Sequence, residues 1–325
     1  MRRCALLKVL LTGGFGYLGG RLAETLAVNG EHEVTLATRR LIPQPSTAPG
    51  TKAIRLDWDS DADLRRACEG TEIVVHLAGM NAADCARDPV AALAFNGVRT
   101  AQLVVAATDM RVRRFIYLST AHVYGGALKG SIDERTCPDP LHPYATSHRA
   151  GEDAVRLACK SGTLEGIVIR LSNSFGAPVD PRADCWSLVT NDLCRQAVQS
   201  GRSVLRSDGN QRRDFMPISE ACRAIEHLMT VPKATVGDGL FNVGGGWAPR
   251  LSELAELVAE RVAAIVGTRP KLEYRSVGDA AGPSDLRYGV TKLQSTGFIS
   301  RPDASVAELD RLVRFCTQHF SGSQA

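Results

Sequence analysis

Short apolar runs alternate with amphipathic segments along the first half of the chain. The runs have the near-continuous hydrophobicity of strands that are buried on both faces of a parallel sheet. They lie at residues 8–12, 33–38, 54–56, 72–77, 114–119 and 166–171. Segments with helical spacing or an acidic helix start lie between them, at 21–28, 59–63, 91–108 and 147–159. Strands that alternate with helices predict an α/β fold, built on a doubly wound parallel sheet with right-handed crossovers.

The second half of the chain is richer in loops. Helical spacing continues there at residues 187–199, 218–229, 251–266 and 306–315. A chain of 325 residues also exceeds the usual size of one domain, about 100–200 residues. We therefore expect a sheet domain at residues 1–175. A smaller C-terminal substrate-binding lobe is expected mainly at residues 176–325, with some segments returning to the sheet.

Composition narrows the class of protein. The chain is 44% hydrophobic and 23% charged, and its formal net charge is +4, which argues against nucleic acid as a partner. Nine cysteines without a C-x-x-C pair indicate free thiols in a reducing, cytoplasmic environment. The apolar run at 4–12 is short and enters a glycine turn, so we interpret it as a strand. We expect no membrane partner, and the sequence has no H-E-x-x-H or clustered Cys/His motif that predicts a metal site.

The glycine turn T-G-G-F-G-Y-L-G at residues 12–19 follows the first strand and precedes a helix. In this context Gly13 allows a tight turn, Gly16 lets the backbone approach a pyrophosphate, and Gly19 lets helix and strand pack closely. The helix N-terminus adds N–H groups and a positive dipole end for the phosphates. The turn therefore predicts a dinucleotide site on a Rossmann-type sheet; a structural turn without a ligand is the alternative. Its cofactor-binding candidates are Gly13, Phe15, Gly16, Tyr17, Leu18 and Gly19.

The residues after the second strand indicate which dinucleotide is preferred. Thr38 is followed by Arg39 and Arg40, and no acidic residue is present to bind a ribose 2′-hydroxyl. Guanidinium groups suit a 2′-phosphate, so the cofactor is expected to be NAD(P), with NADP slightly favoured. The alternative is that both arginines are solvated surface charges. Asp57 and Trp58 follow the third strand, where the carboxylate can accept from an adenine amine or simply start a helix.

Further motifs occur in a fixed order along most of the chain. They are 12–19, 76–79, Asn96, 119–125, 143–144, 170–176, 213–215 and 241–244. With these motifs the sequence resembles the extended short-chain dehydrogenase/reductase family, whose members include nucleotide-sugar epimerases, dehydratases and reductases. The resemblance implies an NAD(P)-dependent enzyme that acts on a nucleotide sugar. It also implies a homodimer, formed through the helices at 91–108 and 147–159.

The resemblance assigns roles to single residues. Thr120 would polarise the substrate oxygen and Tyr144 would be the general acid/base during hydride transfer. The alternatives are a strand-end cap for Thr120 and a loop aromatic for Tyr144. Asn173 and Arg213 would hold the sugar-nucleotide diphosphate; the alternatives are a turn asparagine and a surface arginine. Further cofactor-binding candidates are Leu77, Ala78, Gly79, Asn96, Ser119, Tyr144 and His148.

One position departs from the family pattern Tyr-x-x-x-Lys. The fourth residue after Tyr144 is His148, on the same helix face but mostly neutral at pH 7 with its ordinary pKa of about 6.5. A lysine there would hydrogen-bond the nicotinamide ribose and lower the tyrosine pKa. Three interpretations stay open: His148 is a working catalytic substitute, the enzyme is slow or specialised, or the protein is a dinucleotide-binding sensor or scaffold.

The segment after the fifth strand bears on the reaction. It contains Thr120, Ala121 and His122, where the family's dehydratases carry Thr-Asp-Glu. Without these carboxyl groups dehydration is disfavoured, and epimerisation or carbonyl reduction remain. Epimerases usually hold NAD, whereas the arginine pair favours NADP, so the two indications conflict. Trp186 can stack on a nucleotide base or belong to the core.

Overall fold

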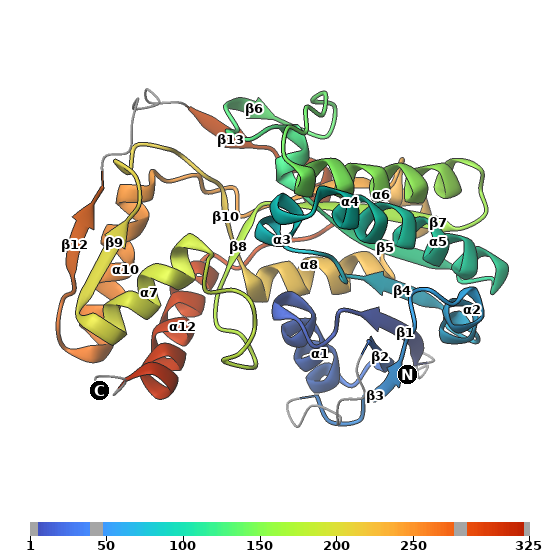
Figure 1. The fold of residues 1–325 in the computed structure, drawn as a ribbon, viewed down its shortest axis with the longest axis horizontal. Helices are drawn as coiled ribbons and strands as arrows, with labels where there is room; N and C mark the ends of the chain where they lie inside the picture. Colours follow the sequence, from blue (N-terminus) through green and yellow to red (C-terminus); the bar gives the residue numbers. More distant parts are fainter. Residues whose placement is uncertain (1–5, 40–47, 276–284, 322–325) are drawn as a thin grey trace.

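Seven parallel strands form one central sheet, in the order β11-β7-β5-β4-β1-β2-β3 (Figure 1). The computed structural model describes residues 6–39, 48–275 and 285–321. The predicted doubly wound parallel sheet is confirmed, and six of its strands match the apolar runs of the sequence. The strands are β1 Leu7–Thr12, β2 His32–Thr38, β3 Lys52–Arg55, β4 Ile73–His76, β5 Arg114–Thr120, β7 Glu165–Leu171 and β11 Leu240–Val243.

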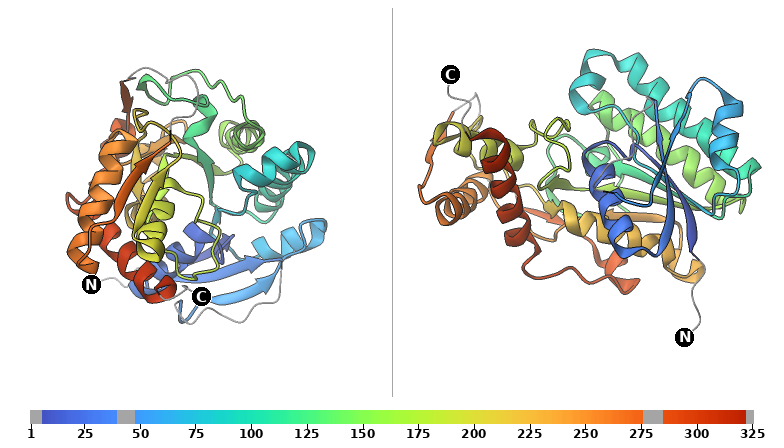
Figure 2. Two further views of the ribbon diagram at one scale, coloured as in Figure 1. Left: turned by 60° about the vertical axis from the view of Figure 1, so that its left-hand side comes forward. Right: turned by 90° about the horizontal axis from the view of Figure 1, so that it is seen from below.

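Helices cover both faces of this sheet. Helices α1 (Tyr17–Asn29) and α8 (Ile218–Thr230) pack on one face, while α2 (Asp61–Cys68), α5 (Thr100–Asp109) and α6 (Pro143–Lys160) pack on the other (Figures 1 and 2). Successive residues of a strand point to opposite faces. Leu11 accordingly packs in the α1/α8 core, and its neighbour Leu10 packs in the α2/α5/α6 core. This burial on both faces explains the near-continuous apolar runs.

The helix predicted at 91–108 is divided into three parts. They are α4 (Pro89–Ala92), the π-helix η1 (Leu93–Arg99) and α5. A π-helical turn inside an α-helix is rare and often marks a functional site. Among the described residues, Pro89–Asp109 is the one helical run whose length and apolar composition would be sufficient to cross a membrane. This run packs against α2 and α6. A mostly buried core helix can have the same length and apolar composition.

A second lobe forms around its own hydrophobic core. Helices α7 (Val189–Ser200), α10 (Leu251–Val266) and α12 (Ala304–Phe320) surround the paired strands β9 (Arg202–Leu205) and β12 (Lys271–Tyr274) (Figure 1). All three helices match helices expected from the sequence. The described cysteines carry free thiols, as expected.

The chain crosses between the two cores several times. Helix α8 and strand β11 return to the sheet, and Leu293 of α11 (Thr291–Ser295) joins the core beside α8. The division into two domains at residue 175, with some later segments returning to the sheet, stays a prediction from the sequence. The remaining elements are short: α3 Ala82–Arg87, η2 Ala121–Tyr124, β6 Gly130–Ile132, β8 Asn173–Phe175, β10 Phe215–Pro217, α9 Lys233–Val236 and β13 Leu286–Tyr288.

A buried ion pair fastens the second lobe to the start of the sheet domain. Arg21 on α1 donates to Glu308 on α12 at 2.7 Å, and both side chains are almost fully buried. The same guanidinium donates to the carbonyl of Ala177 at 2.7 Å, and the Ala177 amide donates to Glu308 at 3.1 Å. Because a buried charge is costly without a partner, this cluster holds α12 against the helix that follows the glycine turn.

Candidate active site

The glycine turn forms a tight cradle between β1 and α1. Gly13 has a φ of +72°, and a methyl group on it would lie 2.8 Å from the amide nitrogen of Ala78. A methyl group on Gly19 would collide with the carbonyl oxygen of Gly13. Helix α1 starts after Gly16 without a side-chain cap and without an acidic residue in its first turn. The cradle therefore fits a pyrophosphate bound by backbone N–H groups.

A cleft of about 950 Å³ opens at the carboxyl ends of the strands, next to this cradle. Ligands of open α/β sheets bind at this edge. The predicted cofactor residues that line the cleft are Gly16, Tyr17, Leu18, Arg39, Asp57, Trp58, Leu77, Gly79, Tyr144 and His148. The structure thus brings together residues from five separate segments of the sequence.

Basic and aromatic side chains form one end of the cleft. The Arg39 guanidinium lies 5.7 Å from the ring centre of Phe95, and the buried Trp58 packs edge-on against the same ring at 5.3 Å. Arg55 and Arg99 also line this end, and Arg99 pairs with Asp59. Sequence reasoning missed both arginines, although Arg55 lies in the third strand two residues before Asp57. Thr38 ends β2 here, and the predicted Arg40 lies outside the described residues.

The three predicted catalytic residues meet at the other end of the cleft. Thr120 ends β5, and Tyr144 follows Pro143 in the first turn of α6. A hydrogen bond joins the side chains of Thr120 and Tyr144, and it lowers the pKa of the phenol. One helical turn further, the ring of His148 lies 4.5 Å from the ring of Tyr144, centre to centre. The structure therefore places the predicted acid/base between a hydroxyl and an imidazole.

Burial controls the charges of this group. It raises the pKa of Tyr144 to about 12, against the smaller opposing effect of the Thr120 hydrogen bond. Burial also lowers the pKa of His148 to about 4, although a hydrogen bond to the Leu118 backbone acts in the opposite direction. At neutral pH the imidazole is uncharged and the phenol is protonated. The positive charge that a lysine would bring to this position is therefore missing.

Two predicted cofactor residues use their side chains inside the protein. Asn96, in the π-helix, accepts from the Met80 amide at 2.8 Å and donates to the Ser147 hydroxyl at 3.0 Å. It thereby ties the loop after β4 to helix α6. Ser119 donates to Glu152 at 2.6 Å, inside a buried ion pair. Any contact of Asn96 or Ser119 with a cofactor stays a prediction, as it does for Phe15 and Ala78.

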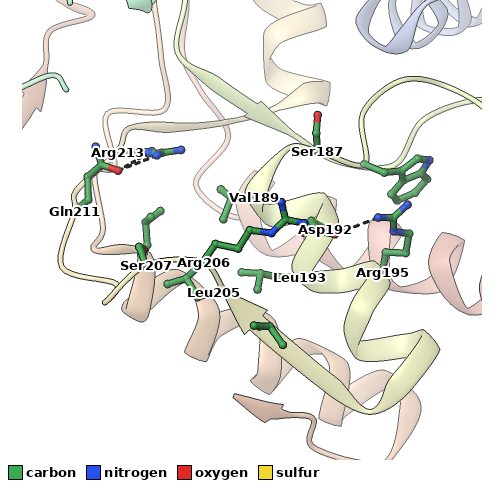
Figure 3. A pocket seen from close by; sticks show the side chains of 13 residues that line it. Ser187, Val189, Asp192, Leu193, Arg195, Leu205, Arg206, Ser207, Gln211 and Arg213 are labelled. Atoms are coloured by element: carbon green, nitrogen blue, oxygen red, sulfur yellow. Dashed lines mark hydrogen bonds and ion pairs between the residues drawn. The ribbon is translucent and has the colours of Figure 1, made fainter. Parts of the chain in front are cut away.

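A second cavity, of about 500 Å³, lies in the smaller lobe between α7, β9 and the start of α10 (Figure 3). Arg195, Arg206 and Arg213 line it, against the single carboxylate of Asp192. Arg213 donates to Gln211 at 2.8 Å, and Arg195 contacts Asp192 at 3.2 Å. The net positive charge suits an anionic ligand. Sequence reasoning found Arg213 but missed Arg195 and Arg206, which only the packing of α7 against β9 brings together.

Other predicted substrate residues lie at the margin of this cavity. Asn173 donates to the Asp214 carbonyl at 3.0 Å, next to Arg213, and is not among the lining residues. Trp186 lines the cavity but packs against Phe320, with ring centres 4.9 Å apart. Trp186 therefore forms a wall of the cavity that is anchored in the core of the second lobe.

The cavity and the catalytic group approach each other at His122. This histidine lies in η2, two residues after Thr120. Its pKa is lowered by desolvation and by the positive charge of Arg213. The guanidinium is therefore close enough to act electrostatically on the catalytic segment.

Comparison with known proteins agrees with this geometry. The model of the NAD dependent epimerase/dehydratase family matches residues 9–244. A dTDP-glucose 4,6-dehydratase from Actinoplanes sp. is 28% identical over 303 residues, covering 87% of this chain and 89% of the relative. A putative UDP-glucose 4-epimerase from Methanocaldococcus jannaschii is 23% identical over 261 residues, covering 78% and 82% respectively. The solved structure of MoeE5 in complex with UDP-glucose and NAD is 27% identical, with a TM-score of 0.75 over 97% of this chain and 100% of that one.

The family match spans the sheet, the glycine turn and the catalytic segment, most of the described fold. The similarity to MoeE5 extends over the second lobe as well. The chain therefore belongs to the NAD-dependent epimerase/dehydratase family of enzymes, in agreement with the resemblance to extended short-chain dehydrogenases/reductases.

Proposed function

We propose that this protein is an NAD(P)-dependent epimerase of a nucleotide sugar. One observation carries the proposal: Tyr144 and His148 line the dinucleotide cleft, while Arg213 of the second cavity acts on the adjoining catalytic segment. A sugar attached to a diphosphate would then lie with its phosphates at the arginines and its ring at Tyr144. UDP-glucose and NAD are the ligands named for MoeE5, and they have this combination of chemistry.

Each group of residues has a separate role in the proposed reaction. The backbone around Gly13 and Gly16 would hold the dinucleotide, whose chemistry would be reversible hydride transfer at a carbinol carbon of the substrate. The Tyr144 phenolate takes the hydroxyl proton at Oη as the carbon is oxidised, and the resulting phenol gives it back on reduction. The Thr120 hydroxyl, hydrogen-bonded to Tyr144, polarises the same substrate oxygen. Arg213 and its neighbours bind the diphosphate with charge-assisted hydrogen bonds.

Epimerisation is favoured over dehydration by the residues beside Thr120. Elimination of water needs an acid and a base at neighbouring carbons. Ala121 carries no ionisable group, and His122 is a single imidazole with a lowered pKa. The dTDP-glucose 4,6-dehydratase from Actinoplanes is similar in sequence. We do not extend its dehydratase activity to this chain, because the segment after Thr120 lacks the carboxyl groups. The retained pair of Thr120 and Tyr144 argues against a sensor without turnover.

Product analysis with defined nucleotide sugars tests the reaction. We expect that the protein converts UDP-glucose or UDP-glucuronic acid to an epimer, without net reduction of added NAD or NADP. Separation of the products by ion-pairing chromatography, with proton NMR of the new peak, would show this. Stoichiometric consumption of NADPH would instead identify a reductase, and a dehydrated keto-sugar would identify a dehydratase. Cofactor binding without any product would favour the sensor.

We propose further that Arg39 selects NADP over NAD. Its guanidinium lies against Phe95 at the basic end of the cleft, where a 2′-phosphate would be recognised. Arg39→Ala should weaken NADP binding about tenfold and change NAD binding little, because one charge-assisted hydrogen bond is removed. Calorimetric titration of both cofactors measures this, with Arg182→Ala, a surface arginine paired with Asp180, as the control. An unchanged protein that binds NAD more tightly than NADP would contradict the preference.

We also propose a homodimer through the outer face of α5 and α6. Val98 of η1, Val105 of α5 and Leu157 of α6 are 52%, 56% and 69% exposed. Burying them against a second copy would remove apolar surface from water. Light scattering should give twice the monomer mass, and Leu157→Glu should give monomers. A monomeric mass for the unchanged protein at micromolar concentration would exclude the dimer.

A further inference from the structure

His148 presents its two ring edges to different surroundings. The imidazole is buried, and Nδ1 lies 3.0 Å from the hydroxyl of Tyr117 on β5. The other edge faces the floor of the dinucleotide cleft: a methyl group on Gly79 would lie 3.7 Å from Nε2 and 3.6 Å from Cε1. Nδ1 therefore faces Tyr117 in the protein interior, and the edge that carries Nε2 and Cε1 borders the cleft. The Leu118 backbone also hydrogen-bonds to the ring and is the partner that competes for its N–H proton.

The hydroxyl of Tyr117 is itself held in place. Its ring stacks on His76, with 5.6 Å between ring centres, and is fully buried. His76 is fixed in turn by hydrogen bonds of 2.6 Å to Thr12 and 3.0 Å to Thr100. A methyl group on Gly151 of α6 would lie 2.5 Å from the Tyr117 oxygen, so the hydroxyl fills the space that this glycine leaves. Tyr117 therefore cannot turn away from His148 without disturbing two elements.

The available acceptors decide where the Tyr117 proton goes. Besides Nδ1 at 3.0 Å, the hydroxyl approaches the carbonyl of Asn96 at 3.4 Å and that of His148 at 3.5 Å. It also hydrogen-bonds to the Thr100 hydroxyl, which is already engaged with His76 at 3.0 Å. The Asn96 carbonyl already accepts from Thr100 at 2.7 Å. Donation to Nδ1 is thus the best hydrogen bond that Tyr117 can make. A neutral imidazole whose Nδ1 accepts carries its proton on Nε2.

We propose that Tyr117 is a positioning residue that fixes His148 as the Nε2–H tautomer and directs this neutral donor to the cleft floor beside Gly79. A donor at this point suits a hydroxyl oxygen of the bound ligand's sugar. Histidine at the position of the family's lysine would then still supply a hydrogen-bond donor to the cleft, oriented by Tyr117 on β5. The role of His148 toward a ligand rests on the proposed function, whereas its tautomer is a property of the protein alone.

Nitrogen NMR of protein labelled with ¹⁵N-histidine tests the tautomer without any ligand. The unchanged protein should show an unprotonated Nδ1 and a protonated Nε2 for His148, assigned from the signals lost in His148→Gln. In Tyr117→Phe, which keeps the ring stacked on His76, the two tautomers should exchange. An Nδ1–H tautomer in the unchanged protein would overturn the proposal, even if Tyr117→Phe did not fold.

A double-mutant cycle tests the consequence for binding. Tyr117→Phe should weaken cofactor binding roughly threefold to tenfold, the effect of one buried hydrogen bond. In a His148→Lys background the same change should alter binding less than about twofold, because the tautomer no longer exists there. Equal losses in both backgrounds would mean that Tyr117 only supports the fold.

Tyr288→Phe is the matched control. It removes another buried hydroxyl, which donates to the Arg170 carbonyl at 2.8 Å and does not contact His148. It should lower stability while leaving the His148 signals and the cofactor affinity unchanged. A shift of the His148 signals in Tyr288→Phe would show that they follow general loosening and would overturn the assignment to Tyr117. The absence of epimerase activity would leave the NMR result intact, so the two proposals fail separately.

Discussion

Tyr144→Phe should lower the turnover number about a thousandfold while leaving cofactor affinity nearly unchanged. General acid/base groups typically contribute about 10²- to 10⁴-fold, and the phenol oxygen is the group that Thr120 holds at the end of the cleft. The phenylalanine ring keeps the contact with His148, 4.5 Å between ring centres, so the local packing should survive. Steady-state kinetics on the epimerised sugar, together with calorimetric titration of the cofactor, separates the two effects.

Tyr288→Phe is again the control for the loss of a buried phenol oxygen. Tyr288 is as buried as a core residue but hydrogen-bonds to Arg170 and Asn242. Its substitution should reduce stability and leave the turnover number within about twofold. If Tyr144→Phe kept a tenth or more of the activity, the proton would have to be transferred by another group, and His122 would be the first residue to test.

Much of the fold could be predicted because the pattern that defines it is local. A strand buried on both faces, such as β4 with Ile73, Val74 and Val75, carries the evidence in its own composition. The short strands of the second half carry no such pattern. Strand β11 has four residues, and β8, β10 and β13 have three each, so their pairing depends on distant segments. The sequence therefore showed helices after residue 175 but not the strands between them.

The candidate site divides in the same way. Gly13 and Tyr144 belong to short motifs whose chemistry depends on spacing along the chain, so they could be identified in advance. The cavity lined by Arg195, Arg206 and Arg213 depends on how α7 and β9 pack, which no local spacing records. Ser119 shows how a non-local contact adds to a local motif: its neighbour Thr120 faces Tyr144, whereas alternation along β5 directs the Ser119 side chain to Glu152.

His148 was visible in a local motif, but its properties depend on the packing around it. The departure from lysine was visible in the sequence, and so was the missing charge. The sequence did not show that burial disfavours the charged forms of both side chains. Burial lowers the pKa of His148 to about 4 and raises that of Tyr144 to about 12. With those values only roughly one phenol in 10⁵ would be ionised at pH 7 without help from the ligand. Activity that depends on the phenolate should therefore rise with pH throughout the neutral and alkaline range.

His148→Lys should raise turnover at pH 7 roughly tenfold to a hundredfold and move the pH–rate profile to lower pH. A cation within about 4–6 Å of an acid favours its ionised form and lowers its pKa by about 1–3 units. Because the rate rises as Tyr144 loses its proton, a lower phenol pKa displaces this rise toward neutral pH by the same amount. Turnover numbers measured from pH 6 to 10 under saturating substrate test the shift.

His148→Gln, a neutral hydrogen-bonding side chain, should leave the position of the pH–rate profile unchanged. A turnover number for His148→Lys that is unchanged or lower across this range would mean that the phenolate is not limiting, and that a neutral donor at position 148 is what catalysis requires.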